Sequence, residues 1–525
     1  MGCTVSTPRH FLHAPGHQSI GPHSEGSLTS NTHPRRWTGK NQLTDVNVRP
    51  LYNIPQRLLL TRCDVGQVVS IDILPDDVLL EIFDFFVDNG GAPLKMVDAD
   101  EWWRTLVHVC RRWRSVVFGS PRRLNLRLVC SNKTPARDTL DAWPALPLII
   151  VCHERAESVD NILAVLERSD RVCEIVTGLE RSDDLEKISG AMQVPFPELT
   201  DLLLWSNDET MSALPDSFLG GSAPRVEHLT LRRIPFPGLP KLLLSATNLV
   251  ELRLEYIPHQ GYFSPEAIVT ALSTLTRLGS LSLLFESPRP DPEHQRPPPP
   301  TRSVLPNLGY FRFKGDSEYL EVVVAHIDAP RLRNLYTTLF NDIIFDTPQL
   351  TQFISRTPTM KVLEKAHVIF DGKAATVELS SLTGKYERLV VEIPCKELDW
   401  QVSSMEQVCT SCLPPLPTLD LHIYGNPHYR QHWQGNVESA LWLRLLHPFT
   451  SVKNLYLSEE IAQRIVPALQ ELVGDRATEV LPTLQKIFLE EDQRSGPVQE
   501  GIQEVVTVRQ ANNHPIAVSY QRSAR

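Results

Sequence analysis

The stretch that decides the fold reads Pro197-Glu198-Leu199-Thr200-Asp201-Leu202-Leu203-Leu204, and variants of it recur along the chain. Residues 224–231, 247–254 and 276–283 repeat the same frame, L-x-x-L-x-L, with an aliphatic residue at each L position. Alternation of this kind over so few residues predicts a short strand with one buried face. The sequence therefore predicts a series of equivalent strands.

The frame continues toward the C-terminus at a nearly regular spacing. Its first position recurs every 23 to 36 residues, close to the leucine-rich repeat period of about 20 to 29 residues. The frame is weakest at Leu363 and Tyr386. The first positions are Leu199, Val226, Leu249, Leu278, Leu308, Leu332, Leu363, Tyr386, Leu416, Val452 and Leu484.

Helical segments separate the frames. Ser264 is suited to cap a helix that starts at Pro265, and Ile268, Leu272 and Leu275 then fall on one face. A short strand with one helix cannot enclose a core, so neighbouring units must stack. We therefore expect an α/β fold, a leucine-rich-repeat-like solenoid with parallel strands on its concave face. The alternative is an ordinary α/β domain whose alternating strands happen to recur.

The solenoid is expected to occupy residues 122–505. Its first strands are predicted at 124–128 and 146–151, with a helix at 160–168. Residues 506–525 are expected to form a C-terminal tail.

One interruption of the repeats is rich in proline. Residues 288–302 include Pro297-Pro298-Pro299-Pro300 and are expected to leave the solenoid as an insertion loop with polyproline character. The alternative is a docking segment for a proline-reading module.

A second organised stretch precedes the repeats, from residue 70 to 121. A helix is expected to begin at Pro75, because proline at the first helical position sacrifices no needed N–H group, and Asp76 and Asp77 suit the positive helix end. A second, single helix is expected to carry Trp102, Leu106, Val109, Trp113 and Val116 on one face. Two helices in about 50 residues are at the margin of independent stability, so this segment should require a partner.

The residues of this stretch resemble the F-box motif. Leu74-Pro75 is followed by Ile82-Phe83 and then by Val109-Cys110-Arg111-Arg112-Trp113-Arg114, in the order of that motif. Residues 87–100 depart from it, because they form a longer loop with more glycine and proline. The resemblance implies that residues 70–121 are an F-box that binds a Skp-family adaptor. It assigns the adaptor contact to Leu74, Pro75, Leu79, Ile82, Phe83, Val109, Cys110 and Trp113.

Beyond this motif, residues 194–200, 234–247, 311–315 and 446–450 resemble a large fungal group of F-box proteins whose targets are largely unassigned. The resemblance implies a substrate receptor of a cullin-type (SCF) ubiquitin ligase, which binds its target through the repeats. The ligase would act by proximity, since other subunits supply catalysis. The alternative is a repeat scaffold outside any ligase, or a lipid-anchored recognition protein.

Composition narrows the class of protein. A net charge of −10 and a pI near 6.0 argue against nucleic-acid binding, which normally requires a concentrated basic face. Nine cysteines at irregular positions are typical of reduced thiols, so we expect a cytoplasmic or nuclear protein. Apolar runs are much shorter than the ~20 residues of a membrane helix.

Residues 1–69 have little periodicity and are expected to be mostly disordered. Met1-Gly2-Cys3-Thr4-Val5-Ser6 fits a myristoylation pattern at Gly2 with Cys3 available for palmitoylation, although so short a pattern also arises by chance. His13 and His17 have a metal-ligand spacing, but Pro15-Gly16 breaks the helix that would align them, which favours a solvated loop.

Motifs for catalysis are absent from the sequence. There is no G-x-S-x-G, Walker A run, H-E-x-x-H or G-x-G-x-x-G. Cys409-Thr410-Ser411-Cys412 is a single C-x-x-C without a second pair, and structural thiols are a simpler interpretation than a zinc or redox site. We therefore expect no enzyme activity, cofactor or metal. An enzyme with an unfamiliar site is the third alternative.

Overall fold

A computed structural model describes residues 73–90, 102–121, 124–131, 135–152, 159–208, 210–288, 302–340, 347–382, 387–413, 418–425, 437–493 and 495–521. The chain divides into two units, Met1–Ile73 and Leu74–Arg525, and the α-helices and β-strands of the described residues all lie in the second. The expected disordered segment 1–69, with Gly2 and Cys3, lies outside the described residues, as does most of the proline-rich segment 288–302.

Three helices precede the repeats. They are α1 Asp76–Gly90, α2 Trp102–Val109 and α3 Arg111–Gly119. The prediction of one helix over 102–116 is wrong, because Cys110 has an extended backbone (φ −156°, ψ 171°) between two helices. Its Sγ accepts a hydrogen bond from the Trp113 backbone N–H at 3.4 Å and caps α3. Regular apolar spacing on both sides of Cys110 concealed this break.

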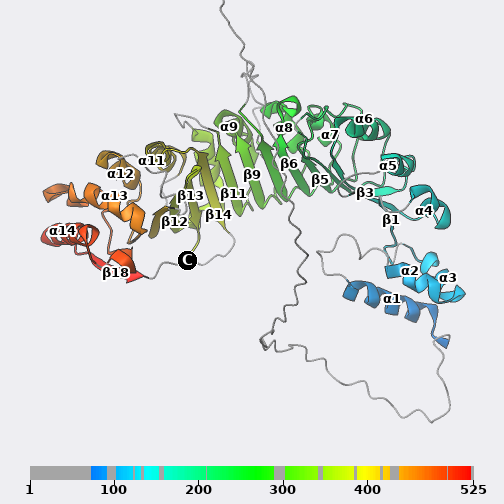
Figure 1. The fold of residues 1–525 in the computed structure, drawn as a ribbon, viewed down its shortest axis with the longest axis horizontal. Coiled ribbons are helices and arrows are strands. Elements are labelled where there is room, and N and C mark those ends of the chain that lie inside the picture. The colour runs from blue at the N-terminus through cyan, green and yellow to red at the C-terminus, as the bar shows by residue number, and fades with distance from the viewer. Residues whose placement is uncertain are drawn as a thin grey trace, which may run out of the picture. The chain divides into compact units, whose positions relative to one another are not determined.

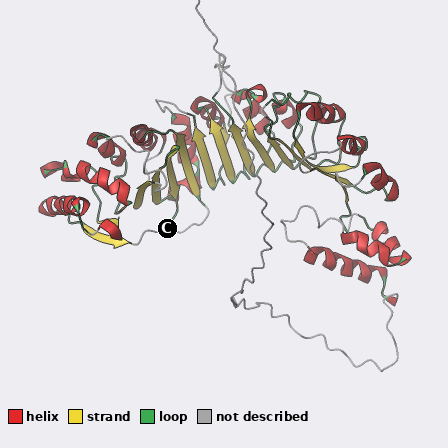
Figure 2. Cartoon of the chain, viewed as in Figure 1, coloured by secondary structure: helices red, strands yellow, loops and turns green. Residues whose placement is uncertain are grey.

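The repeats form one sheet of sixteen strands among the described residues, with helices along one face (Figures 1 and 2). In spatial order the strands are β1 Leu128–Ser131, β2 Leu148–Cys152, β3 Val172–Leu179, β4 Asp201–Ser206, β5 His228–Arg232, β6 Glu251–Ile257, β7 Ser280–Phe285, β9 Tyr310–Gly315, β11 Asn334–Leu339, β14 Arg388–Pro394, β13 Ala374–Ser380, β12 Lys365–Phe370, β15 Asp420–Gly425, β16 Asn454–Leu457, β17 Lys486–Glu490 and β18 Ala517–Gln521. β8 Ser303–Val304 and β10 Ile327–Asp328 form a separate parallel pair.

The helices cover the face of the sheet on which the L positions lie. Alternate strand residues such as Leu202 and Leu204 are buried, as the frame requires. Ser264 Oγ accepts a hydrogen bond from the Ala267 N–H at 3.2 Å, which confirms the predicted helix start. These helices are α4 Ala136–Ala142, α5 Val159–Leu166, α6 Ser182–Ala191, α7 Leu239–Leu243, α8 Pro265–Leu272, α9 Ser317–Ala325, α10 Pro348–Arg356, α11 Leu398–Gln407, α12 Ser439–Leu446, α13 Glu459–Gln470 and α14 Pro497–Ala511. We call the opposite face of the sheet the open face.

The predicted frame and the observed register agree for most repeats. Asp201, His228 and Glu251 are aligned across β4, β5 and β6, and each lies two residues after a predicted first position. The position at Leu416 is wrong by two residues: β15 starts at Asp420, so its first position is the buried Thr418. Leucines at 416, 419 and 421 create an overlapping frame that misplaced this repeat.

The order of the strands departs from a simple solenoid at β12–β14. β11 pairs in parallel with β14 rather than with the next strand in sequence, and β13 is antiparallel to both β12 and β14. β13 is therefore an extra strand, antiparallel to both of its neighbours. The first position at Leu363 is confirmed, because Leu363 is buried and β12 starts two residues after it. The other first position in question, Tyr386, lies outside the described residues.

Both ends of the solenoid differ from the prediction. The first strand is β1, which starts at Leu128 rather than Leu124, whereas Leu124 and Leu126 are buried before it. Residues 506–521, expected as part of a tail, contain the end of α14 and all of β18, which pairs in parallel with β17. β3 and α6 complete an early repeat that the frame did not reveal.

Candidate protein-binding surfaces

One helix exposes an apolar face. Val78, Ile82 and Phe85 on α1 are 41 %, 42 % and 71 % exposed, and Ile73 just before the helix is 70 % exposed. Positions i, i+4 and i+7 lie on one side of a helix, so these side chains form a continuous stripe. We call Val78, Ile82 and Phe85 the α1 stripe. An exposed apolar stripe of this kind is typical of a protein-binding surface.

The structure divides the eight predicted adaptor-binding residues by exposure. Leu79 and Phe83 are buried, and the Phe83 ring packs edge-on against Trp113 with 4.9 Å between centroids. The others are exposed or half-buried. Pro75, Ile82 and Val109 are exposed, and Leu74, Cys110 and Trp113 are half-buried. The prediction omitted Ile73, Val78 and Phe85, although the spacing of Val78, Ile82 and Phe85 was readable in the sequence.

An ion pair ties the start of α1 to α3. The Arg112 guanidinium lies 2.7 Å from the Asp76 carboxylate and also donates to the Leu74 carbonyl oxygen. Both side chains of the ion pair are partly exposed, so the free energy of this pair is small. Its structural consequence is that Leu74 and Pro75 are held beside α3.

Aromatic side chains join these helices to the first repeat. The Trp103 indole N–H donates to the Arg127 carbonyl oxygen at 3.0 Å, just before β1. Its ring also meets Trp143, which follows α4, with 5.0 Å between centroids. One apolar cluster therefore runs from Leu79 on α1 to Ile516 beside β18. The three helices are stabilised by the repeat as well as by one another.

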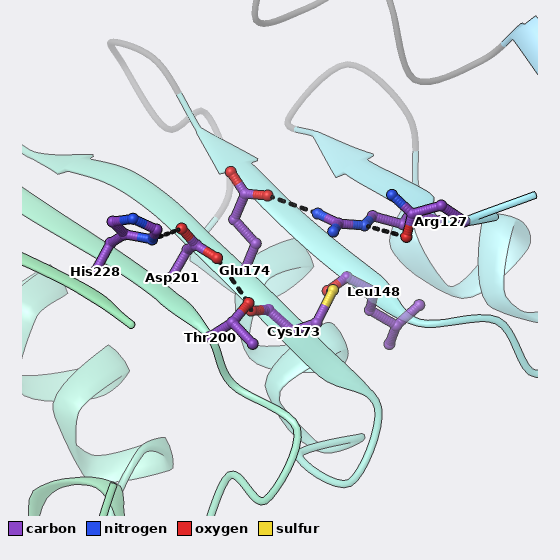
Figure 3. Close-up of polar contacts among 8 residues, drawn as sticks. Arg127, Leu148, Cys173, Glu174, Thr200, Asp201 and His228 are labelled. Atoms are coloured by element: carbon purple, nitrogen blue, oxygen red, sulfur yellow. Dashed lines mark hydrogen bonds and ion pairs between the residues drawn. The ribbon is translucent and has the colours of Figure 1, made fainter. Parts of the chain in front are cut away.

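The open face carries polar pairs around β3, β4 and β5 (Figure 3). Asp201 accepts from Thr200 Oγ1 at 2.6 Å and lies 2.7 Å from His228 Nδ1 on the next strand. Arg127 similarly pairs with Glu174 at 3.3 Å. Cross-strand pairs of opposite polarity contribute roughly 0.2–1 kcal/mol each, and they place hydrogen-bonding groups in register along the sheet.

Farther along, the open face carries a stack of rings. His367, His422, Tyr456 and Phe488 are aligned across β12, β15, β16 and β17. Successive ring centroids are 4.6, 3.9 and 4.3 Å apart, with interplanar angles of 14°, 2° and 4°. We call these four residues the ring stack. It adds an apolar row to a face that also carries polar pairs and a small apolar cluster of Ile149, Val151 and Cys173.

The two histidines of the ring stack are neutral at pH 7. Burial lowers the pKa of His367 to about 4, and the positive charges of Lys365 and Arg388 add to this shift. Burial lowers the pKa of His422 to about 3, with further contributions from His367 and Lys365. A charged His422 imidazole would lose water on both ring faces, because His367 and Tyr456 stack on it from either side. The stack therefore acts as an apolar surface.

Three cysteine thiols are too weakly acidic to act as nucleophiles. Burial raises the pKa values of Cys130, Cys173 and Cys395 to about 11, so these groups stay protonated. Cys409 is buried in a π-helical turn, Val408–Cys412. Within the described residues, no three His, Cys, Asp or Glu side chains are grouped to hold a metal ion.

No helix in the described part of the chain has both the length and the apolar character needed to cross a membrane. The strand order and the helices along one face define a leucine-rich-repeat-like α/β solenoid, a fold suited to protein binding, with the α1 stripe and the open face as its candidate surfaces.

Comparisons with known proteins do not refine the assignment to a leucine-rich-repeat-like fold. No family model matches the chain, and no curated protein matches its sequence. Among solved structures, the chain is similar to the leucine-rich repeat-containing protein LegL7 from Legionella pneumophila, at 13 % identity and a TM-score of 0.22, over 72 % of this chain and 96 % of that one. The repeat assignment rests on the strand register of this chain itself.

Proposed function

We propose that this protein is a substrate receptor of a cullin-type ubiquitin ligase. In this proposal the α1 stripe and its surroundings bind a Skp-family adaptor, which is bound in turn to the cullin scaffold, and the open face binds a target protein. The observation that carries the proposal is the α1 stripe, because a helix in a small module exposes apolar side chains that a folded protein normally covers.

A substrate receptor must also connect its adaptor-binding and target-binding surfaces. Trp103 links the helices to the first repeat through its hydrogen bond to the Arg127 carbonyl oxygen, so an adaptor and a target bound at the two surfaces would be held by one continuous core. Holding a target near a charged ubiquitin-conjugating enzyme makes transfer effectively intramolecular. The chain itself would then need no catalytic group.

The test is adaptor binding by a stripe variant. Ile82→Glu with Phe85→Glu places two charges in the apolar stripe without touching the buried Leu79 and Phe83. A partner interface centred there should lose binding by at least about 30-fold, since two such contacts contribute roughly 2–4 kcal/mol. The measurement is the Kd for a purified Skp-family adaptor and co-purification of cullin from cells.

A matched control uses an exposed aliphatic residue on another part of the chain. Val362 is 55 % exposed, and Val362→Glu should leave adaptor binding unchanged. Failure of the parent protein to bind any Skp-family adaptor would reject the ligase proposal and favour a repeat scaffold, tethered or free. Equal binding by the stripe variant would reject the assignment of the site.

A further inference from the structure

Two consecutive arginines at the end of β5 converge on one aromatic ring. The Arg232 and Arg233 guanidinium carbons lie 5.3 and 5.1 Å from the centroid of the Tyr256 ring on β6. Consecutive residues of a strand normally point to opposite faces. Here Arg233 has a left-handed backbone (φ 54°), which ends the alternation and brings both positive charges to the same ring.

Neither guanidinium has a carboxylate partner among the described residues. Glu255 is the cross-strand neighbour of Arg232, yet no ion pair joins these two described side chains. Two nearby arginines are paired, Arg225 with Glu198 at 2.7 Å and Arg253 with Glu251 at 2.6 Å. The Arg233 Nε is buried and donates to no acceptor in the described part of the chain. A buried donor without an acceptor is unfavourable, so this guanidinium lacks part of its hydrogen bonding.

The backbone around these side chains is also strained. Tyr256, like Arg233, has a φ of 54°, and the Arg233 N–H donates to the Glu255 carbonyl oxygen at 2.9 Å to hold the turn. Left-handed backbone is unfavourable for residues with a Cβ atom, and such strain concentrates at functional sites.

The neighbouring tryptophan does not join this cluster. Trp205 on β4 is the cross-strand neighbour of Arg232, but its ring lies over β3, against Gly178, where an added Cβ atom would be 2.6 Å from it. The cluster therefore consists of Arg232, Arg233 and Tyr256.

We propose that Arg232 and Arg233, arranged on Tyr256, form a binding site for a phosphate monoester group. Guanidinium groups donate paired hydrogen bonds to phosphate oxygens, and the aromatic ring keeps the two side chains in place without neutralising them. Arg232, Arg233 and Glu255 together carry a net charge of +1, which modestly favours binding of a phosphate dianion. The inference rests on the proposed function and deepens it, because a phosphorylated side chain of a target on the open face would supply the group.

The experiment measures phosphate binding by the full chain. Inorganic phosphate is titrated by isothermal calorimetry at constant ionic strength, with chloride as the reference anion. We expect a Kd in the millimolar range for the parent and binding at least about tenfold weaker for Arg232→Gln with Arg233→Gln. Arg253→Gln is the matched control, since Arg253 is already paired with Glu251, and should change the Kd by less than about threefold.

Two further measurements test the electrostatics of the site and the source of the phosphate group. Glu255→Gln removes the nearby negative charge and should tighten phosphate binding severalfold, which a merely destabilised site would not do. A phosphoserine peptide and free phosphoserine are compared next, to separate a target-borne group from a small molecule. Equal phosphate binding by the parent and the double variant, or none by the parent, would overturn the site. Adaptor binding by the same double variant should be unchanged, so that failure of this site is distinct from failure of the proposed function.

Discussion

Arg509 provides a sharp test of where the solenoid ends. It lies on α14, is only 3 % exposed, and its guanidinium donates to the carbonyl oxygens of Val480 at 2.5 Å and Leu481 at 2.9 Å. Burial lowers its pKa, but an arginine remains charged at neutral pH. This buried charge is held by two backbone carbonyls. Its removal takes a donor from the Val480 oxygen and leaves the Leu481 oxygen with only its bond from the Leu484 N–H.

The magnitude is set by those two hydrogen bonds. Each bond to a charged group contributes about 1.5–3 kcal/mol, so Arg509→Gln should destabilise the C-terminal repeat by roughly 3–6 kcal/mol. Repeat proteins unfold locally because each unit contacts mainly its neighbours. Hydrogen exchange should therefore become faster in α14 and β18, while exchange in β4–β7 stays the same.

The control is an exposed arginine nearby. Arg476 pairs with Glu479 at 2.7 Å with its side chain 59 % exposed, and Arg476→Gln should change the unfolding free energy by less than about 0.5 kcal/mol. Equal protection of β18 in the parent and in Arg509→Gln would refute the view that residues 506–521 belong to the repeat core.

Two further predictions concern the open face. Gly178→Val should displace the Trp205 side chain, because even a Cβ atom at residue 178 would lie 2.6 Å from the Trp205 ring. We expect a shift in tryptophan emission and a loss of about 1–3 kcal/mol in the free energy of unfolding measured in urea. An unchanged emission spectrum would contradict this packing. The pKa values of about 4 for His367 and about 3 for His422 lie below that of an unfolded histidine, so the unfolded chain binds more protons as the pH falls. The contribution of these two residues to stability should therefore be complete above pH ~6.5 and should fall progressively toward pH 4. His367→Gln with His422→Gln should lose less stability than the parent between pH 7 and pH 5 in urea titrations; equal losses would contradict the assigned burial.

Local chemistry made much of this protein predictable. The frame at Leu199 and its repeats predicted strand and core positions because alternation along one strand depends only on neighbouring residues. Pro75 and the two acids after it predicted the start of α1 for a similarly local reason. The same local reasoning failed at Cys110, where an extended residue divides two helices without interrupting the apolar spacing.

The sequence by itself determined the repeat frame, the helix starts and the apolar positions that fill the core. Tertiary structure alone decided that β14 pairs with β11, that β18 closes the sheet, and that Phe85 is exposed while Phe83 is buried. It also brought Arg232, Arg233 and Tyr256 together. These features depend on contacts between residues distant in sequence or on a single backbone angle. Neither kind of feature produces a periodic pattern in the amino-acid sequence.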